Sequence, residues 1–596
     1  MSARTELPGG FLEEDGPAWQ RIRRYAVPGW MIERATGHRL AGDWRAACAA
    51  AAVDIRFDLP RLAARHGAPV AEAVEEDLRH LAPDLVRWHL PRVLGGRTTI
   101  DPDVRVLLAR YGADADADAP VLSVTTGPMI DGPQRLLLHC APVDPAEHSR
   151  VYFGVNQLRA EDWTAARPLW DARHTAALRE RHTGGAGRLP FFRPDGTPLP
   201  PAELPTADPG AADPAGHAEW VALLHARGEF AEAYEAAGIE RDLTVPEESG
   251  AYGRPMDPER LMASSSADLT RLGPEVRRLA EAGAGERFRM AVDWRGSLLV
   301  ERVGSGPDGR LRARAITRDE TKEVARLPLF AWKRLPDLEL VRTGRITPRE
   351  LHPLVAEALF PAAGPAVGPP GPAEAKPVRV RCRGEWHEVR SQGGVLDLLP
   401  HSREEQQRER AMRAFGGAIE GCFAVQQIWT TGEGRLPRAL RAEQRDLFLR
   451  AQHGDTPGVG ALLDAGMDPR IRDARGYTLL HLLHLLDHEA LLPRLLAAGL
   501  DLEAQAKSGH TPLQIAVQYG GSADLVRAFV EAGSRIDVTD DSELSLAQVV
   551  RRYKRTDLAF LRGRVEEEFP DIGSEWFDEY MDERESDEEH EDDEDA

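Results

Sequence analysis

The sequence predicts a multidomain protein with an α+β N-terminal body, a C-terminal all-α repeat array of about four units, and a disordered acidic tail. Three observations support this prediction. Two glycine-containing markers recur every 33 or 34 residues near the C-terminus, a proline-rich segment divides the chain, and the last residues are mostly Asp and Glu. With 596 residues and 42% hydrophobic content, the chain is long and apolar enough for three or four domains with their own cores.

The net charge of −22 is concentrated at the C-terminus. Residues 578–596 contain thirteen Asp or Glu and one Arg, a balance of −12, so the other 577 residues carry about −10. No region is strongly basic, which argues against a broad surface for duplex nucleic acid. The N-terminus has no apolar signal core and no stretch reaches 18 uninterrupted apolar residues. We therefore expect a cytoplasmic protein that does not act on membranes.

The four cysteines do not form a recognisable ligand or disulfide pattern. They are far apart in the chain, with no CxxC pair and no adjacent histidine pattern: Cys48, Cys140, Cys382 and Cys422. A disulfide framework or a structural zinc site is therefore not expected, and reduced, mostly buried thiols are. We expect no metal and no cofactor.

The N-terminal body begins with residues 1–190, in which a helical part precedes a mixed α+β part. Asp58 followed by Pro60 is typical of a helix start, and Pro83 should split a later helical pattern. After these helices we expect a strand pair, 121–126 and 135–140, around a turn at residues 131–133. A further strand is expected at 151–155 and a helix at 160–181.

Segments rich in proline and glycine mark the remaining boundaries. Residues 191–217 lack periodicity and are expected to form a linker or a long surface excursion. Residues 218–360 should form an α+β region with an antiparallel meander over 288–303 and 311–316. Residues 361–377 are expected to be an extended linker, followed by a small α+β segment over 378–435 that begins with a hairpin.

No catalytic constellation is evident in the body. The chain lacks a phosphate loop, a dinucleotide fingerprint, a zincin motif, a nucleophile elbow and the kinase motifs. The basic and aromatic run from Arg87 to Arg92 could stack a nucleotide, and Ser264–Ser266 could supply a nucleophile, but packing and loop roles are favoured for both. His387 and Glu388 are adjacent in an expected strand and should point to opposite faces. We therefore expect no catalytic residue and no enzymatic activity.

The C-terminal repeat is marked by two independent motifs. Gly476-Tyr477-Thr478-Leu479-Leu480-His481 is followed 33 residues later by Gly509-His510-Thr511-Pro512-Leu513-Gln514-Ile515-Ala516. Ala465-Gly466 recurs as Ala498-Gly499 and Ala532-Gly533. A fixed period of this length is typical of stacked helix pairs. Residues 444–560 resemble ankyrin repeats, with a full match to Gly-x-Thr-Pro-Leu-x-x-Ala at Gly509–Ala516 and Leu479 in place of Pro in the preceding unit.

The resemblance implies binding to another protein through loop tips and the concave helix face. The family's motif positions build the fold, so no contact residue is carried over from them. The repeat geometry instead places the candidates at the loop tips: Asp473, Arg475, Gln505, Lys507, Thr539 and Asp540. A purely structural role for the array, as a prop for the larger body, is the alternative.

The tail over residues 571–596 combines acidic residues with aromatics and is expected to be disordered. Trp576, Phe577 and Tyr580 could dock on a basic partner, whereas a solubilising tail is the simpler interpretation.

Three functional hypotheses remain. The first is an intracellular, bacterial-type interaction protein, a scaffold, adaptor or regulator that acts through ankyrin repeats. The second is an enzyme or toxin-related effector whose activity lies in the N-terminal body, and a cleft with converging polar residues there would favour it. The third is an immunity or inhibitor protein that uses the acidic tail.

Overall fold

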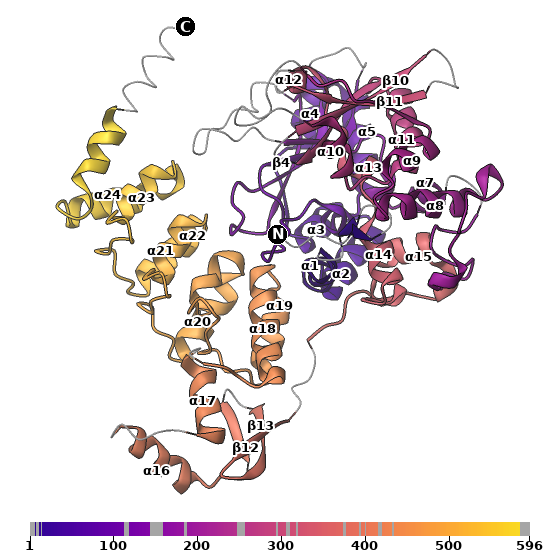
Figure 1. The fold of residues 1–596 in the computed structure, drawn as a ribbon. Helices are drawn as coiled ribbons and strands as arrows, with labels where there is room; N and C mark the ends of the chain where they lie inside the picture. The colour runs from indigo at the N-terminus through magenta and orange to yellow at the C-terminus, as the bar shows by residue number, and fades with distance from the viewer. Residues whose placement is uncertain are drawn as a thin grey trace. The chain divides into compact units, whose positions relative to one another are not determined.

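The structure is a computed structural model that describes most of the chain (Figure 1). The described residues are 6–7, 11–12, 15–112, 118–143, 159–183, 187–246, 257–293, 296–304, 310–317, 320–372, 377–392, 395–399, 401–414, 420–431 and 434–583. They divide into two compact units. The first unit lies within residues 1–127 and 135–370, and the second within 128–134 and 371–596.

A five-stranded mixed sheet lies at the centre of the first half of the first unit. Its strand order is β3–β6–β5–β4–β7, with bounds Val53–Ile55, Leu136–Ala141, Val121–Thr126, Val104–Arg110 and Arg159–Asp162. The two outer pairs are parallel and the inner pairs are antiparallel. The predicted pairing of residues 121–126 with 135–140 is confirmed, whereas the strand expected at 151–155 lies outside the described residues.

The helix expected over residues 160–181 is wrong. This segment begins as the edge strand β7, continues into the 3-10 helix η3 (Arg167–Leu169), and becomes helical only in α7 (Ala177–Thr183). Two causes are visible. The strand pairs in register with β4, and Pro168 cannot donate the backbone hydrogen bond that a continuous helix needs at that position.

Six helices precede or cover this sheet. They are α1 to α6, with bounds Gly16–Tyr25, Gly29–Leu40, Trp44–Ala50, Leu59–His66, Ala68–His80 and Pro83–His89. Asp58 caps α4 by accepting the Arg61 backbone N–H at 3.0 Å. Helix α5 ends before Pro83 and α6 begins there, so the predicted split is confirmed. A short antiparallel pair, β1 (Glu6–Leu7) and β2 (Phe11–Leu12), lies at the start of the chain.

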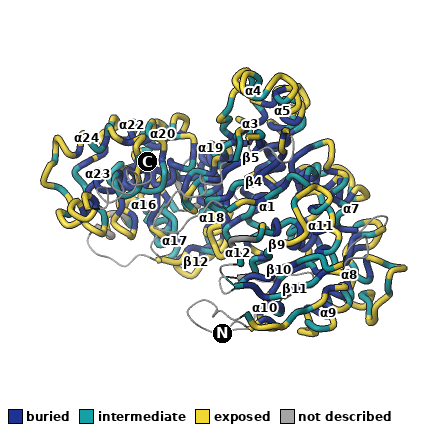
Figure 2. Tube along the Cα trace, turned by 90° about the horizontal axis from the view of Figure 1, so that it is seen from above, coloured by how far each residue is buried: buried dark blue, intermediate teal, exposed yellow. Residues whose placement is uncertain are grey.

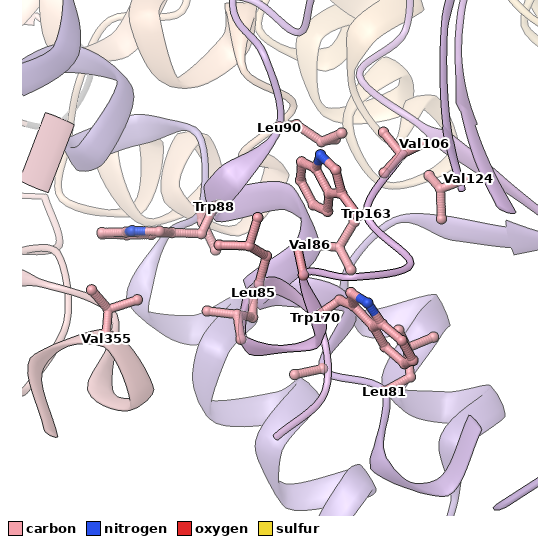
Figure 3. Close-up of a cluster of buried hydrophobic side chains, with 14 of the residues drawn as sticks. Leu81, Leu85, Val86, Trp88, Leu90, Val106, Val124, Trp163, Trp170 and Val355 are labelled. Carbon is pink, nitrogen blue, oxygen red and sulfur yellow. The ribbon is translucent and has the colours of Figure 1, made fainter. Parts of the chain in front are cut away.

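The core of this half is built around buried tryptophans. Trp88, Trp163 and Trp170 are all at most 2% exposed and lie among aliphatic side chains from α6, the sheet and α15 (Pro353–Leu359) (Figure 3). In Figure 2 strands β4 and β5 are mostly buried, whereas α4 and α5 carry exposed residues on their outer side. Burial of side chains this large is the main stabilising contribution to the unit.

A second sheet organises the other half of the first unit. Its order is β8–β11–β10–β9, with bounds Ile239–Asp242, Arg310–Ile316, Gly296–Val303 and Arg287–Asp293. The predicted antiparallel meander is confirmed by β9, β10 and β11. The sequence did not reveal β8, which joins β11 in parallel. The helices of this half are α8 to α13, with bounds Pro214–Ala226, Phe230–Ala236, Pro258–Ala263, Leu269–Glu281, Glu320–Glu323 and Leu329–Trp332. Helix α14 (Pro336–Arg342) returns to the core of the first half, where its Leu338, Leu340 and Val341 are buried.

The two proline-rich segments are more ordered than expected. Phe191 and Phe192 are fully buried, so the first segment starts in the core before it continues through η4 (Pro201–Glu203) and η5 (Gly210–Ala212). Residues 361–370 belong to the first unit and include η8 (Pro361–Ala363). The preceding 3-10 helix is η7 (Pro348–Glu350). Val367 N donates to Arg349 O at 2.9 Å, and Pro369 is buried. The boundary between the two units falls inside the expected linker over 361–377, and the proline-rich first half of this segment packs on the body.

The second unit starts with a small sheet and two helices. The sheet order is β12–β13–β14, with bounds Val378–Cys382, Glu385–Gln392 and Val395–Leu399, all antiparallel. Helices α16 (Arg403–Ala414) and α17 (Gly421–Thr431) follow. The predicted hairpin is confirmed, and β14 extends it by one strand.

Consecutive helix pairs complete the second unit (Figure 1). Their bounds are α18 Arg438–Gln452 with α19 Thr456–Asp464, η9 Leu480–Leu485 with α20 His488–Ala497, α21 Pro512–Gln518 with α22 Ala523–Glu531, and α23 Leu546–Arg552 with α24 Ala559–Glu568, the last two separated by η10 Thr556–Leu558. A continuous hydrophobic cluster runs through all of them. Each pair therefore buries its apolar face against its neighbours, as stacked repeats must.

The start of the acidic tail is not disordered. Residues 575–583 are helical, and Phe577 and Met581 are buried against the last helix pair. Gln548 Nε2 donates to Asp578 Oδ2 at 2.7 Å, which ties this helix to α23. The predicted disorder over 571–596 is thus corrected for 571–583, because Phe577 and Met581 complete the apolar face of the array. Residues 584–596 lie outside the described residues.

Candidate functional site

Two first helices of the array, α21 and α23, start with a polar cap whose glutamine also reaches the segment that follows. Thr511 N donates to Gln514 Oε1 at 2.8 Å, and Gln514 Nε2 donates to Thr539 O at 2.7 Å. Ser545 and Gln548 repeat the arrangement 34 residues later, and Gln548 Nε2 donates to Ser574 O at 2.8 Å. The same side chain therefore closes a capping box and links two units.

The unit with Thr478-Leu479 in place of Thr-Pro uses a histidine for the same purpose. His481 Nδ1 accepts the Thr478 backbone N–H at 3.1 Å, and its Nε2 lies 3.2 Å from His510 O, which makes Nε2 the protonated donor nitrogen. The ring is fully buried, and this burial lowers the pKa of His481 to about 4. The first helix here is the 3-10 helix η9, which starts without the proline found at the first position of α21.

These caps direct the bonded capping side chains inward, away from the loop tips. Gly476 and Gly509 take φ angles of 80° and 79°, which permit the tight loop turns. Of the six predicted tip residues, four are exposed: Arg475, Gln505, Lys507 and Thr539.

The other two tip residues are structural acceptors rather than free contacts. Asp473 Oδ1 accepts the backbone N–H groups of Arg475 and Tyr477, both at 2.8 Å. Asp540 Oδ1 accepts those of Ser542 and Leu544, both at 2.9 Å. These carboxylates fix the loops by local turns, as short acidic side chains commonly do.

The three aromatic tail candidates separate in the same way. Phe577 is 6% exposed and packs in the array core, so it is not available for docking. Trp576 and Tyr580 are 69% and 41% exposed, and their rings stack with centroids 5.6 Å apart. Trp576 and Tyr580, four residues apart, lie on one exposed face of the helix, whereas Phe577 directly follows Trp576 and points into the core.

A second candidate site is a cavity inside the first unit, of about 260 Å³. Its apolar wall includes Trp19, Trp163, Leu178 and Phe330. Its polar lining comes from seven separate segments of the chain: Asp15; His89 and Arg92; Asp101; Glu161; Arg181 and His182; Ser266 and Arg271; and Lys333 and Arg334. Mostly apolar walls with a few convergent polar groups are typical of small-molecule sites.

Most charged groups of the cavity already have partners. Arg181 Nη1 donates to Glu275 Oε2 at 3.1 Å, and Glu161 Oε2 accepts the Leu329 backbone N–H at 2.8 Å. Burial raises the pKa of Glu161. At the edge of the lining, Lys333 Nζ donates to Ser266 Oγ, so one of the serines singled out in the sequence meets a lysine.

Arg92 is the exception among these groups. Its side chain is buried, and only Nη2 has a partner, the Arg87 carbonyl oxygen at 2.6 Å. Nε and Nη1 have no hydrogen-bond partner among the described residues, and neither does the buried Nε2 of the neighbouring His89. Burial, with the nearby Arg87 and Arg23 charges, lowers the pKa of Arg92. A buried guanidinium without an anion is costly, so the cavity is electrostatically suited to an anion.

The sequence indicated part of this cavity but not its composition. The run from Arg87 to Arg92 does contribute His89 and Arg92, yet Trp88 is not available for stacking. Its ring is buried, and Nε1 donates to Asp337 Oδ1 at 3.1 Å. Glu161, Arg181 and Arg271 gave no signal because they lie in unrelated segments. The first unit thus has a cavity with converging polar residues, the feature that would favour the second functional hypothesis.

The structure also brings together two cysteines and two histidines that the sequence left apart. They are Cys382, His387, His401 and Cys422, whose ligand atoms all lie within 4.8 Å of one another. All four cysteines are free and buried, as predicted. Cys382 and Cys422 nevertheless lie beside the two histidines, because the small sheet and α17 pack against each other.

Comparison with known proteins bears on the array. A family model described as ankyrin repeats (3 copies) matches residues 447–540. A similar protein is an ankyrin repeat-containing protein of Schizosaccharomyces pombe, 29% identical over 105 residues, which is 18% of this chain. The match spans about half of that relative, 49% of its length. Among the described residues, none of the helices has the length and apolar character needed to cross a membrane. Residues 447–540 are thus ankyrin repeats, and they indicate a role in protein–protein interaction.

Proposed function

We propose that this chain is an interaction protein of the scaffold, adaptor or regulatory kind, and that its array holds another protein through the loop tips. The supporting observation is the division of polar groups within each repeat. Capping side chains satisfy one another and the next unit, whereas Arg475, Gln505, Lys507 and Thr539 remain exposed at the loop tips. A partner with acidic groups spaced like the tips would meet Arg475 and Lys507 together.

Charge reversal at the tips tests this function. The variant Arg475→Glu/Lys507→Glu is compared with the full-length wild-type chain in affinity capture from the source cell. We expect specific partners to be lost from the double variant. The matched control is Arg564→Glu, which changes an exposed arginine on α24 that pairs with Glu568 in the same helix. Identical partner sets for wild type and the double variant would refute the proposal.

A second candidate function is favoured by the cavity of the first unit, namely the binding of a small organic anion. The observation that supports this function is Arg92, whose buried Nε and Nη1 lack hydrogen-bond partners among the described residues. An anionic group on the ligand would accept hydrogen bonds from Arg92 and His89, and an aromatic or aliphatic body would contact Trp163 and Phe330. The first functional hypothesis does not depend on this cavity, so the two functions are independent.

Phenyl phosphate is a suitable probe, because it joins an anion to an aromatic ring. We expect it to raise the thermal midpoint of the full-length chain, and neutral phenol to have no comparable effect. The variant Arg92→Met should abolish the shift. It should also leave the free protein as stable as wild type or more so, since an uncompensated buried charge is removed.

The control for this experiment is Arg193→Met. Arg193 is an exposed arginine of the same unit that pairs with Glu203 outside the cavity. A shift of equal size in Arg92→Met and in Arg193→Met would show that phenyl phosphate binds elsewhere.

A further inference from the structure

The structure assigns a further site to the second unit: we propose that Cys382, His387, His401 and Cys422 bind one Zn²⁺ ion in a four-coordinate structural site. The residues come from four neighbouring elements. Cys382 ends β12, His387 lies in β13, His401 follows β14, and Cys422 is the second residue of α17. This is a Cys₂His₂ set, and two thiolates with two imidazoles form a donor combination that structural zinc sites use.

The distances between ligand atoms fit one ion. Cys382 Sγ lies 3.6 Å from His401 Nε2, and Cys422 Sγ lies 3.7 Å from His387 Nδ1. His387 Nδ1 and His401 Nε2 are 2.9 Å apart. A tetrahedral Zn²⁺ at about 2.3 Å from sulfur and about 2.0–2.1 Å from nitrogen separates sulfur from nitrogen by about 3.6 Å and nitrogen from nitrogen by about 3.4 Å. Both sulfur–nitrogen distances match, and the nitrogen pair needs only a small opening.

The four atoms converge because the backbone is shaped for it. Gly421 has a φ of 62°, and a Cβ atom there would stand 2.5 Å from Cys382 Sγ. Only glycine lets the start of α17 approach β12 this closely. Arg383 and Gly384, directly after Cys382, also have positive φ angles of 52° and 89°, which make the tight turn into β13. The hairpin therefore brings the side chains of Cys382 and His387 to the same cluster.

Contacts behind the cluster hold His401 in place. His401 Nδ1, the nitrogen that does not face the cluster, lies 3.5 Å from Glu405 Oε2. The same carboxylate oxygen accepts the Ser402 backbone N–H at 3.1 Å, so its position is fixed. The His401 ring also packs on Phe423 with centroids 4.6 Å apart. A carboxylate behind a ligand histidine sets the tautomer and strengthens the imidazole as a donor.

The surroundings favour a structural role over a catalytic one. Cys382 and Cys422 are both at most 2% exposed and belong to a hydrophobic cluster with Val389 and Trp429. Four protein ligands leave no open position for a substrate or a water molecule. The segment is also short, with three strands and two helices, and such a small region gains much of its stability from a metal cross-link. The ion would thus fix the sheet to α17 at the entrance to the array.

The test uses the full-length chain, purified without metal-affinity resin and in reductant. Elemental analysis should find about one zinc per chain in wild type and less than a tenth of that in Cys422→Ala. Cys140→Ala is the matched control, because Cys140 is a buried cysteine outside the cluster, and it should keep its zinc. Zinc content that is equally low in wild type after growth in zinc-supplemented medium would overturn the proposal.

Cobalt binding keeps the proposal testable if Cys422→Ala fails to fold. Co²⁺ added to chelator-treated wild-type chain should give the visible bands of a tetrahedral site and a sulfur-to-cobalt charge-transfer band. Cys382→His should keep the visible bands and lose about half of the charge-transfer intensity, since one thiolate of two remains. An octahedral spectrum, or an unchanged charge-transfer band in this variant, would contradict the ligand set. A Cys382–Cys422 disulfide in the freshly purified chain, detected by mass spectrometry, would also overturn it.

Discussion

The array and the N-terminal body keep their buried polar groups satisfied by opposite means. In the array, Gln514 bonds to Thr511 three residues away and to Thr539 in the next unit, 25 residues away. In the body, Arg23 pairs with Asp337 across 314 residues, and His352 with Asp84 across 268. Local, repeated contacts make the array modular. Long-range, single contacts make the body dependent on a few residues, and they also make it hard to recognise from sequence.

The largest effect is expected where the body relies on one residue. Asp337 is fully buried and accepts hydrogen bonds from Arg23 Nε and Nη2 at 2.9 and 2.7 Å and from Trp88 Nε1 at 3.1 Å. Asp337→Ala leaves the Arg23 charge buried and unpaired, so we expect a loss of about 4 kcal/mol in the free energy of unfolding. Urea unfolding, with hydrogen exchange of α1 and α14 to locate the effect, measures it.

The double variant Arg23→Met/Asp337→Leu sharpens this prediction. Removing both charges should recover much of the stability lost in Asp337→Ala, because no uncompensated charge remains. Glu357→Ala is the exposed control and should change stability little. A loss below about 1 kcal/mol in Asp337→Ala would show that the body does not depend on this pair.

Acid should weaken the array through His481. Its pKa is lowered from the ordinary value of 6.5 to about 4, so the folded state binds its proton less readily than the unfolded state. The contribution of neutral His481 to the free energy of unfolding is therefore fully present above pH 6.5 and is lost as the pH drops towards 4. At pH 5 the expected loss from this residue is about 2 kcal/mol. Arg472 and His484, the nearest charged and titratable groups, also oppose its protonation.

His481→Gln separates this effect from other titrations. Glutamine occupies the equivalent position in the next two units, as Gln514 and Gln548, and can keep both the cap and the bond to the next loop. We expect the variant to lose less stability than wild type between pH 7 and pH 5, by about the 2 kcal/mol assigned to the histidine. Urea unfolding followed by far-UV circular dichroism at both pH values compares them. Parallel pH profiles would exclude His481 as the source.

These contacts explain how much the sequence could predict. The 33-residue spacing of Gly476 and Gly509 and the Thr511-Pro512 start identified the array, because each feature is needed within its own repeat. The strands of the body were found where apolar runs flank a turn, as at residues 121–126 and 135–140. Strand β7 and the cavity were not, since Glu161, Arg181 and Arg271 acquire their roles only through distant partners. The Cys/His cluster could not be predicted for the same reason. Cys422 and Cys382 are far apart in the sequence, and only folding brings them together.

A smaller effect is expected when one link of the array is removed. Gln514→Ala breaks the capping box at α21 and the hydrogen bond from Nε2 to Thr539 O. We expect a loss of about 1–2 kcal/mol, because each unit keeps its apolar contacts with both neighbours. Hydrogen exchange should increase mainly in α21 and in the loop around Thr539. Gln505→Ala, at an exposed tip, is the control, and exchange that rises equally across the first unit would contradict the modular description.

The smallest effect on stability should come from the residues proposed to bind. Arg475 is exposed, and its contacts are the Asp473 carboxylate at 3.3 Å and the Tyr477 ring at 4.3 Å. Surface contacts of this kind contribute little, so Arg475→Ala should change the free energy of unfolding by less than about 0.5 kcal/mol. If partner capture falls in this variant while urea unfolding is unchanged, the tip serves binding alone. If stability falls by as much as in Gln514→Ala, the tip belongs to the scaffold, and the division of polar groups within each repeat does not hold.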